Sequence, residues 1–276
     1  MFVTIQDDFD LEKIMNSGQC FRVKKLEDGS FRFITGHSLL YIRGTDTPGL
    51  FEADCTDEDW ERVWTPYFDL GRNYAAIRDA IPADDIPMRN AAACGAGIRV
   101  LRQDPFETLI SFIISQRKSI PSIRSSVGAI ANVCGEAVES GRESLHYFPA
   151  PEAILSHSRE IEAICRLGYR VPYVFDAARA VTDGTVDLAQ LASLPDELVE
   201  AMLMRIKGVG PKVAGCVALF AYGRTSFAPI DVWIRRVMDL YYGGRNPFPR
   251  YGDTAGILQQ YIYYAVQHET RDLLKD

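Results

Sequence analysis

Cysteine and histidine are scarce in this sequence of 276 residues, and neither type forms a cluster. The six cysteines stand at positions 20, 55, 94, 134, 165 and 216, without any Cys-x-x-Cys pair, and the four histidines are scattered. Zinc sites and iron–sulfur clusters need closely spaced ligands of these types. The sequence therefore predicts reduced thiols, no metal site and no other cofactor.

Long apolar runs and a basic N-terminus are missing as well. The first eight residues contain two aspartates and no lysine or arginine, the reverse of a signal peptide's start. No apolar stretch approaches the roughly 20 residues that span a bilayer. At 47% hydrophobic and 24% charged residues, the composition excludes a disordered chain and a small disulfide-rich scaffold. We expect a cytoplasmic protein with no membrane partner.

Positive charge is in short supply overall, but it is concentrated in one stretch. The net charge is −7, and residues 1–100 carry 17 acidic against 11 basic side chains. Residues 205–250 carry eight basic side chains against two acidic ones. A local basic stretch in an acidic protein indicates a polyanion, such as nucleic acid, bound over a limited footprint. The alternative is an ordinary solvated face.

The hydrophobic pattern changes near residue 56. Before it, alternation and turn signals predict antiparallel strands at 21–25, 31–34, 39–43 and 50–55. After it, helical periodicity predicts helices at 57–68, 73–81, 105–115, 120–133, 172–181, 195–206, 211–222, 232–240 and 254–268. The predicted fold class is α+β, with a small N-terminal antiparallel sheet domain followed by an all-helical body.

Three segments follow from this pattern. Residues 1–102 form the predicted sheet domain with its linking helices, residues 103–241 the helical domain, and residues 242–276 a C-terminal helix. Helix 105–115 begins with Asp104 and Pro105, a strong start signal. Because its body is apolar nearly all round, we expect it to be a buried central helix.

A glycine turn, Gly208-Val209-Gly210, joins two of the predicted helices. The glycines permit left-handed backbone and a close approach of another chain. Pro211 occupies the first helical position, so the free amides of that first turn lie at the positive end of the helix dipole. Such a start binds anions, of which a DNA phosphate is one. The alternative is an ordinary interhelical turn.

Lys212 stands in that first helical turn, where the dipole disfavours a cation. An amine nucleophile must be partly neutral near pH 7, so the position suits one. The alternative is an exposed lysine that tolerates a small penalty. Cys216 follows one turn later on the same face, where its thiol lines a pocket or packs in the core.

Asp231 precedes helix 232–240, where an N-cap is the simplest interpretation. The eight linking residues 223–230 reach about 26 Å at roughly 3.3 Å each, which is enough to bring Asp231 back beside Lys212. A carboxylate beside an amine nucleophile stabilises a cationic sugar and serves proton transfers.

Four motifs resemble one known family, in order along nearly the whole chain. The segment from Gly208 to Cys216, followed by Pro229-Ile-Asp-Val-Trp233, resembles the helix–hairpin–helix DNA glycosylases that have a catalytic lysine. Ser17-Gly-Gln-Cys-Phe-Arg22, Leu167-Gly-Tyr-Arg170 and Gln259-Gln-Tyr-Ile-Tyr263 resemble the 8-oxoguanine DNA glycosylases in particular, in a bacterial version. The resemblance implies an enzyme of base excision repair that acts at the nucleoid as a monomer on double-stranded DNA containing 8-oxoguanine.

The resemblance also implies roles for single residues. Lys212 attacks C1′ of the damaged nucleotide, expels the base and forms a Schiff base that permits strand cleavage by β-elimination, while Asp231 stabilises the developing oxocarbenium. The flipped base lies between Cys216 and Tyr263. The Gly18 carbonyl accepts the N7–H that only 8-oxoguanine has, and Gln259 reads the Watson–Crick edge.

The remaining implied roles concern the duplex. Tyr169 and Arg170 fill the gap left by the flipped base and touch the orphaned partner. The residues that hold or contact DNA elsewhere are Gly208, Val209, Gly210 and Arg117. Without the family pattern, Gly18 reads as a glycine at a strand entry, and Tyr169 and Tyr263 as ordinary packing residues.

The sequence departs from the family pattern at several positions. Gln116-Arg117-Lys118-Ser119 stands where animal members have an asparagine-rich run. Trp233 replaces a histidine, Val23 a tryptophan and Tyr263 a phenylalanine. The preference for a particular base opposite the lesion is therefore left open.

Three other functions were weighed against this one. A helix–hairpin–helix glycosylase for another damaged base is the first, although iron–sulfur members carry four cysteines after the hairpin and none follows Cys216. A non-catalytic DNA-binding module leaves Lys212 and Asp231 unexplained. A Schiff-base lyase acting on a small metabolite predicts an α/β barrel, whose strand–helix alternation is absent.

Overall fold

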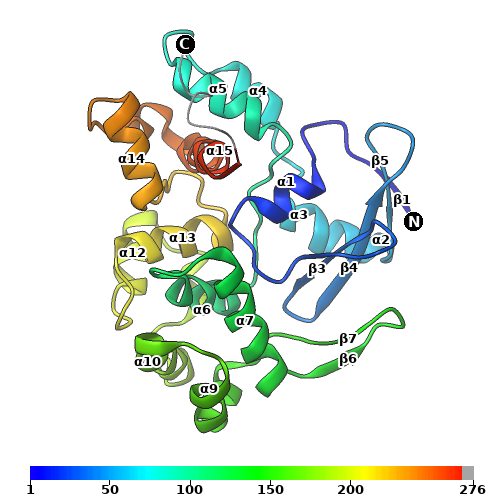
Figure 1. Ribbon diagram of the computed structural model, residues 1–276, viewed down its shortest axis with the longest axis vertical. Coiled ribbons are helices and arrows are strands. Elements are labelled where there is room, and N and C mark those ends of the chain that lie inside the picture. Colours follow the sequence, from blue (N-terminus) through cyan, green and yellow to red (C-terminus); the bar gives the residue numbers. More distant parts are fainter. Residues whose placement is uncertain (269–276) are drawn as a thin grey trace. The chain divides into compact units, whose positions relative to one another are not determined.

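The computed structural model describes residues 1–268, which form two compact units (Figure 1). Unit 1 comprises Met1–Phe33, Leu40–Arg102 and the described residues from Gly223 onward. Unit 2 comprises Ile34–Leu39 and Gln103–Tyr222. The three segments that the sequence predicts stay a prediction. No helix in the described part of the chain is long and apolar enough to cross a membrane.

A five-stranded sheet dominates the N-terminal part, as the sequence predicts. Its strands lie in the order β1 (Phe2–Thr4), β5 (Leu50–Ala53), β4 (Ser38–Gly44), β3 (Phe31–Thr35) and β2 (Lys24–Lys25). Strands β1 and β5, β4 and β5, and β2 and β3 pair antiparallel. The predicted strand 21–25 is wrong in its first half, because Phe21 and Val23 are buried in the core rather than paired in the ladder. Strand β1 was not predicted.

Aromatic rings fill the core behind this sheet. Phe68 is fully buried, and it meets Phe9, Phe33 and Tyr67 edge to face at centroid distances of 5.0–5.1 Å. Edge-to-face contacts match the positive ring edge to the negative ring face. The helical stretch that supplies Phe68 consists of α2 (Asp57–Asp59), a π-helical turn (Trp60–Trp64) and α3 (Thr65–Tyr67), where the sequence predicts one helix.

A fully buried arginine ties the loops of unit 1 together. Arg99 pairs with Asp7 at 2.8 Å and lies over the Tyr74 ring at 3.8 Å. It also donates to the carbonyls of Phe68, Asp69, Arg72 and Asp8. A buried guanidinium is tolerable only when its donors find such partners.

The other helices of unit 1 are α1 (Leu11–Asn16), α4 (Tyr74–Asp79), α5 (Ile86–Gly95), α14 (Val232–Tyr241) and α15 (Ala255–His268), with a 3₁₀ segment at Phe248–Thr254. Helix α5 was missed by the sequence analysis, although Asp85 caps it. It packs closely on α15, since a Cβ on Gly95 would lie 2.4 Å from the Tyr261 ring. This packing anchors α15, the helix that carries Gln259 and Tyr263.

Helix α6 (Pro105–Ser115) is the centre of unit 2, which confirms the predicted buried helix. Asp104 caps it by accepting from Glu107 N at 2.8 Å. Leu109, Ile110, Ile113 and Ile114 are fully buried. Its neighbours are α7 (Ile120–Cys134), α10 (Val171–Thr182) and α13 (Pro211–Tyr222).

The body is mostly helical rather than all-helical. A hairpin of β6 (Ala137–Glu139) and β7 (Ser144–His146) was not predicted, and neither were α8 (Pro151–Ser156), α9 (Ser158–Ile164), the 3₁₀ turn Gly168–Arg170 and α11 (Leu188–Leu191). Helix α12 (Asp196–Leu203) ends three residues before its predicted end. The apolar pattern continues to Ile206 because this side chain packs into the core from a turn.

Candidate active site

A tight turn joins α12 to α13 in unit 2, as predicted. Gly208 has φ of +87°, and a Cβ there would lie 2.4 Å from the Tyr173 ring, so both its conformation and its space require glycine. Val209 is buried and anchors the turn, while Gly210 is exposed. The turn is therefore held rigidly, with its far end open to solvent.

The start of α13 has no side-chain cap from the residue that precedes it. Gly210 has no side chain, and Pro211 has no N–H to satisfy. Ala214 N donates to Gly210 O at 2.9 Å, which closes the first helical turn. The amides of Lys212 and Val213 lie in that turn, at the positive end of the helix dipole, where an anion is stabilised.

Lys212 projects from this first turn and is half-buried. Its Nζ lies 5.1 Å from the centroid of the Phe112 ring, which in turn stacks on Phe220 at 5.3 Å. An aromatic face attracts an ammonium group, so Phe112 gives the amine a fixed place. Cys216, one turn further along α13, is 3% exposed.

Asp231 belongs to unit 1 and caps α14. Its Oδ1 accepts from Trp233 N and Ile234 N, both at 2.9 Å, while its second oxygen takes no part in the cap. The N-cap interpretation is confirmed. The predicted approach of Asp231 to Lys212 stays a prediction, because the two residues belong to different units.

Gly18 and Tyr263 meet within unit 1. Gly18 has φ of +76°, and a Cβ there would lie 2.7 Å from Tyr263 Cε1. The neighbouring Gln19, 1% exposed, braces this segment: its amide donates to Arg99 O and Ser17 Oγ, each at 2.8 Å, and its carbonyl accepts from Leu101 N at 2.7 Å. The backbone at Gly18 is therefore fixed from both sides.

Gln259 lies on α15, one turn before Tyr263, and is 4% exposed. Its Nε2 donates to Pro229 O at 3.2 Å, and its Oε1 accepts from Gln260 Nε2 at 3.3 Å. Pro229 lies two residues before Asp231, so this bond connects the Gln259 side chain to the segment that ends in the α14 cap. Unit 1 thus brings together Gly18 with Tyr263, and Gln259 with residues 229–231.

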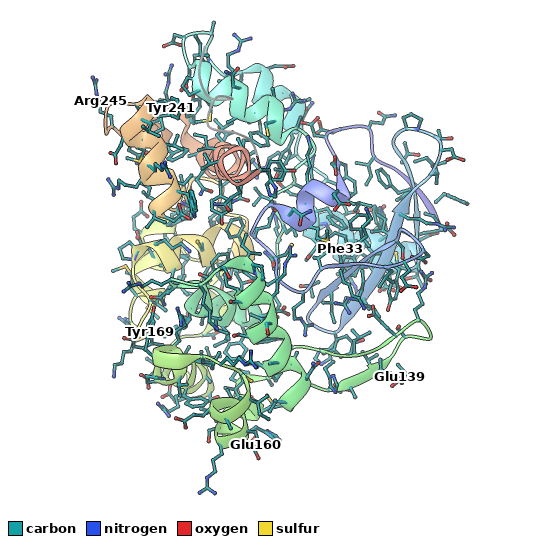
Figure 2. All side chains as sticks on the ribbon, in the orientation of Figure 1. Phe33, Glu139, Glu160, Tyr169, Tyr241 and Arg245 are labelled. Atoms are coloured by element: carbon teal, nitrogen blue, oxygen red, sulfur yellow. The ribbon has the colours of Figure 1, made fainter. Side chains whose placement is uncertain are left out.

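Tyr169 and Arg170 differ sharply in exposure. The Tyr169 side chain lies at the surface, 52% exposed (Figure 2). Arg170 is 5% exposed, and its guanidinium donates to Gln116 O, with Nε at 2.9 Å, and to Leu167 O. These bonds fix the Arg170 guanidinium against backbone carbonyls, and its predicted contact with DNA stays a prediction. Arg117, in contrast, is exposed.

Sequence reasoning assigned no role to Gln116, Phe112 and Gln19, although their side chains contact predicted site residues or the backbone beside them. Gln116 Nε2 donates to Ile113 O and Gly208 O, both at 3.1 Å, and so joins the end of α6 to the glycine turn. The one available signal was a glutamine directly after a strongly apolar helix.

Among the described residues, no group of three His, Cys, Asp or Glu side chains is arranged to hold a metal ion.

Comparisons with known proteins show which family the chain resembles. A family model described as the N-terminal domain of 8-oxoguanine DNA glycosylase matches residues 1–109. A probable N-glycosylase/DNA lyase of Methanothermobacter thermautotrophicus is 28% identical over 98% of this chain and 96% of its own length.

Two solved structures cover almost the full length. MBOgg1, bound to a low-affinity DNA ligand, is 36% identical with a TM-score of 0.89, over 96% of this chain and 94% of its own. The 8-oxoguanine glycosylase/lyase of Clostridium acetobutylicum, bound to double-stranded DNA with cytosine opposite 8-oxoguanine, is 29% identical with a TM-score of 0.86, over 97% of each chain. The chain belongs to the 8-oxoguanine DNA glycosylase family.

Proposed function

We propose that the chain is a DNA glycosylase with AP lyase activity, which excises 8-oxoguanine from double-stranded DNA in base excision repair. The observation that carries this proposal is an amine, that of Lys212, at the start of a helix that follows a rigid glycine turn. The family supports the substrate and the reaction class. The Schiff-base route is the finer part of the proposal and needs its own test.

In this route the Lys212 amine attacks C1′ of the damaged nucleotide. The C1′–N9 bond breaks, and its electron pair leaves with the base, which takes up a proton. The amine then loses a proton, and its lone pair forms the C1′=N bond of a protonated Schiff base as the C1′–O4′ bond breaks and O4′ takes up a proton. β-elimination removes a proton from C2′ and breaks the C3′–O bond, and the 3′ phosphate leaves. Asp231 stabilises the positive charge that develops on the sugar, using the carboxylate oxygen that the α14 cap leaves over.

Four residues are proposed to hold the flipped base. Gly18 O accepts from N7–H, which guanine lacks, and Gln259 reads the Watson–Crick edge. Cys216 and Tyr263 stack on the two faces of the ring. The rigid backbone around Gly18 supports this assignment, because a fixed acceptor left without its donor penalises the undamaged base.

The amides of the turn Gly208-Val209-Gly210 and of the start of α13 are proposed to hold a DNA phosphate. Tyr169, exposed beside this turn's neighbour Tyr173, is proposed to fill the space that the flipped base leaves. We further infer that the protein acts as a monomer in the cytoplasm, at the nucleoid of a bacterium, because its substrate is chromosomal DNA.

Borohydride trapping tests the proposal. A labelled duplex with one 8-oxoguanine, placed opposite each of the four bases in turn, is incubated with the protein and reduced. We expect a covalent adduct that is absent in Lys212→Gln and present in Lys25→Gln, a matched control at an exposed lysine paired with Glu12 on the sheet. The four duplexes rank the opposite base.

The other outcomes are equally informative. An adduct with an abasic site but not with 8-oxoguanine would keep the lyase chemistry and overturn the substrate. No adduct with either, together with unchanged DNA binding by Lys212→Gln, would leave a non-catalytic DNA-binding module.

A further inference from the structure

Two exposed arginines in unit 2 have a left-handed backbone. Among the described residues other than glycine, positive φ occurs at Asp69, Arg117 and Arg166. Asp69 is buried, and its carboxylate is bound by Arg72 and Arg102. Arg117, with φ of +53°, and Arg166, with φ of +52°, are both exposed.

A left-handed backbone is energetically unfavourable for an arginine. The left-handed region brings Cβ close to the following carbonyl oxygen, and only glycine, asparagine and aspartate adopt it readily. Backbone strain of this kind clusters at functional sites, where the surrounding structure maintains it. Two arginines in this conformation therefore indicate that their side chains are needed at these places.

The buried Arg170 and the half-buried Lys118 hold the strained backbone through hydrogen bonds. Gln116 O accepts from Arg170 Nε at 2.9 Å and from Tyr169 Oη at 3.3 Å. Lys118 Nζ donates to Arg166 O at 2.9 Å and to Ser126 Oγ at 2.5 Å. The residues on both sides of Arg117 are thus held, and Lys118 connects this turn directly to the backbone of Arg166.

The four cations of this corner, Arg117, Lys118, Arg166 and Arg170, form no ion pair with a described residue. The half-buried Lys118 and the buried Arg170 bind carbonyl and hydroxyl oxygens instead. Burial lowers the pKa of the Lys118 amine, and the charge of Arg170 lowers it further. Cations that form no ion pair with their neighbours attract a polyanion from outside.

We propose that Arg166 is a contact to a DNA phosphate and works as a pair with Arg117, while Lys118 and Arg170 position the two and do not touch DNA. This inference rests on the proposed function, because it takes DNA as the ligand. It also gives Arg170 a positioning role in place of the base contact that the sequence predicts. The Tyr169 ring lies against the Arg170 guanidinium, and its hydroxyl donates to Gln116 O.

The test is the salt dependence of DNA binding by Arg166→Gly. The probe is a duplex with an uncleavable abasic analogue, and its Kd is measured between about 50 and 300 mM salt. Each lost phosphate contact lowers the slope of log K against log salt by about 0.9. We expect this loss in Arg166→Gly, and the same loss in Arg117→Gly.

Thermal stability provides the second readout, because the proposal predicts that Arg166→Gly weakens DNA binding without lowering the Tm. Glycine adopts the left-handed backbone without strain, so the Tm of Arg166→Gly should be unchanged or higher. An arginine with a merely structural role would lower both Tm and binding when removed. Arg166→Lys keeps the charge and should restore the slope.

Arg179→Ala is the matched control. Arg179 lies on ordinary helical backbone in α10 of the same unit and pairs with Asp176, so its removal should leave the salt slope unchanged.

A double-mutant cycle tests the positioning role of Lys118. Lys118→Met should weaken binding in the wild-type background and add nothing to Arg166→Gly, since it acts through Arg166. A further loss of about one slope unit in the Arg166→Gly background would mean that Lys118 itself contacts a phosphate, and would overturn this part.

The inference and the proposed function can fail separately. An unchanged slope in Arg166→Gly, with intact borohydride trapping by the same variant, would overturn the arginine pair alone. Absence of DNA binding by the wild-type protein at low salt would overturn both.

Discussion

The two units bind a buried arginine in opposite ways. In unit 1 the fully buried Arg99 pairs with the Asp7 carboxylate, and the more exposed Arg78, Arg72 and Arg102 also pair with carboxylates of the same unit. In unit 2, Arg170 and Lys118 bind only carbonyl and hydroxyl oxygens, and the exposed arginines beside them have no ion pair among the described residues. Charges that are matched internally stabilise a fold, whereas unmatched charges are available to a ligand.

The largest effect that tests this comparison is expected at Arg99. Arg99→Met removes the guanidinium that pairs with the Asp7 carboxylate and leaves several buried carbonyls without that donor, so the free energy of unfolding should fall by about 3 kcal/mol or more. Urea denaturation measures the loss. Arg43→Met, which removes an exposed pair with Glu52, should cost less than about 1 kcal/mol. Equal losses in the two variants would contradict the distinction.

The next effect concerns Asp231, which serves both the fold and the proposed chemistry. Asp231→Asn keeps a cap for α14 but removes the charge, so stability should change little while trapping falls about a hundredfold. Asp231→Ala should lose the cap as well, at about 1 kcal/mol. Thermal unfolding and trapping rates are measured side by side. Full trapping activity in Asp231→Asn would remove the carboxylate from the mechanism.

The smallest effect is a dependence of stability on pH at Asp7. Burial acts to raise the pKa of this carboxyl, but hydrogen bonds from the backbone at Tyr74, Asp8 and Ala75 and from Arg99 outweigh it, so the pKa lies below its usual value. A carboxyl with a lowered folded-state pKa contributes stability above its unfolded pKa, and the contribution is lost as pH falls through the folded value. We expect urea stability to drop below about pH 4. In Asp7→Asn this part of the drop should be absent, and an unaltered profile would contradict it.

Signals carried by a few neighbouring residues predicted the elements whose conformation depends on those residues. Asp104 and Pro105 with a run of apolar residues specified α6, and Gly208, Gly210 and Pro211 specified the turn before α13. Short elements such as β1 and α8 were missed, because their residues lack periodicity and tertiary packing decides their conformation. Helix α5 was missed although Asp85, which caps it, is a residue type that is typical of helix starts.

The candidate site divides along the same line. The sequence predicts roles for Lys212 and Asp231 from the chemistry that their residue types support and for Gly18 from the family resemblance, and all three roles stay predictions. Gln19 and Gln116 could not be found, since their roles come from bonds to backbone atoms about 80 and 90 positions away. The DNA contact of Arg170 came from the family resemblance and stays a prediction, while its burial is visible only in the structure and supports the positioning role proposed above.

The contact between Gly18 and Tyr263 has a consequence for how the gene can vary. Four glycines of the N-terminal sheet region, Gly18, Gly29, Gly36 and Gly49, have a left-handed backbone, and of these Gly29 and Gly36 face open space. Asparagine can therefore replace those two at small cost. At Gly18 the ring of Tyr263 already occupies the place of a side chain. The codon for Gly18 can therefore change only to synonymous codons, while the codons for Gly29 and Gly36 can accumulate missense changes under the same selection for repair.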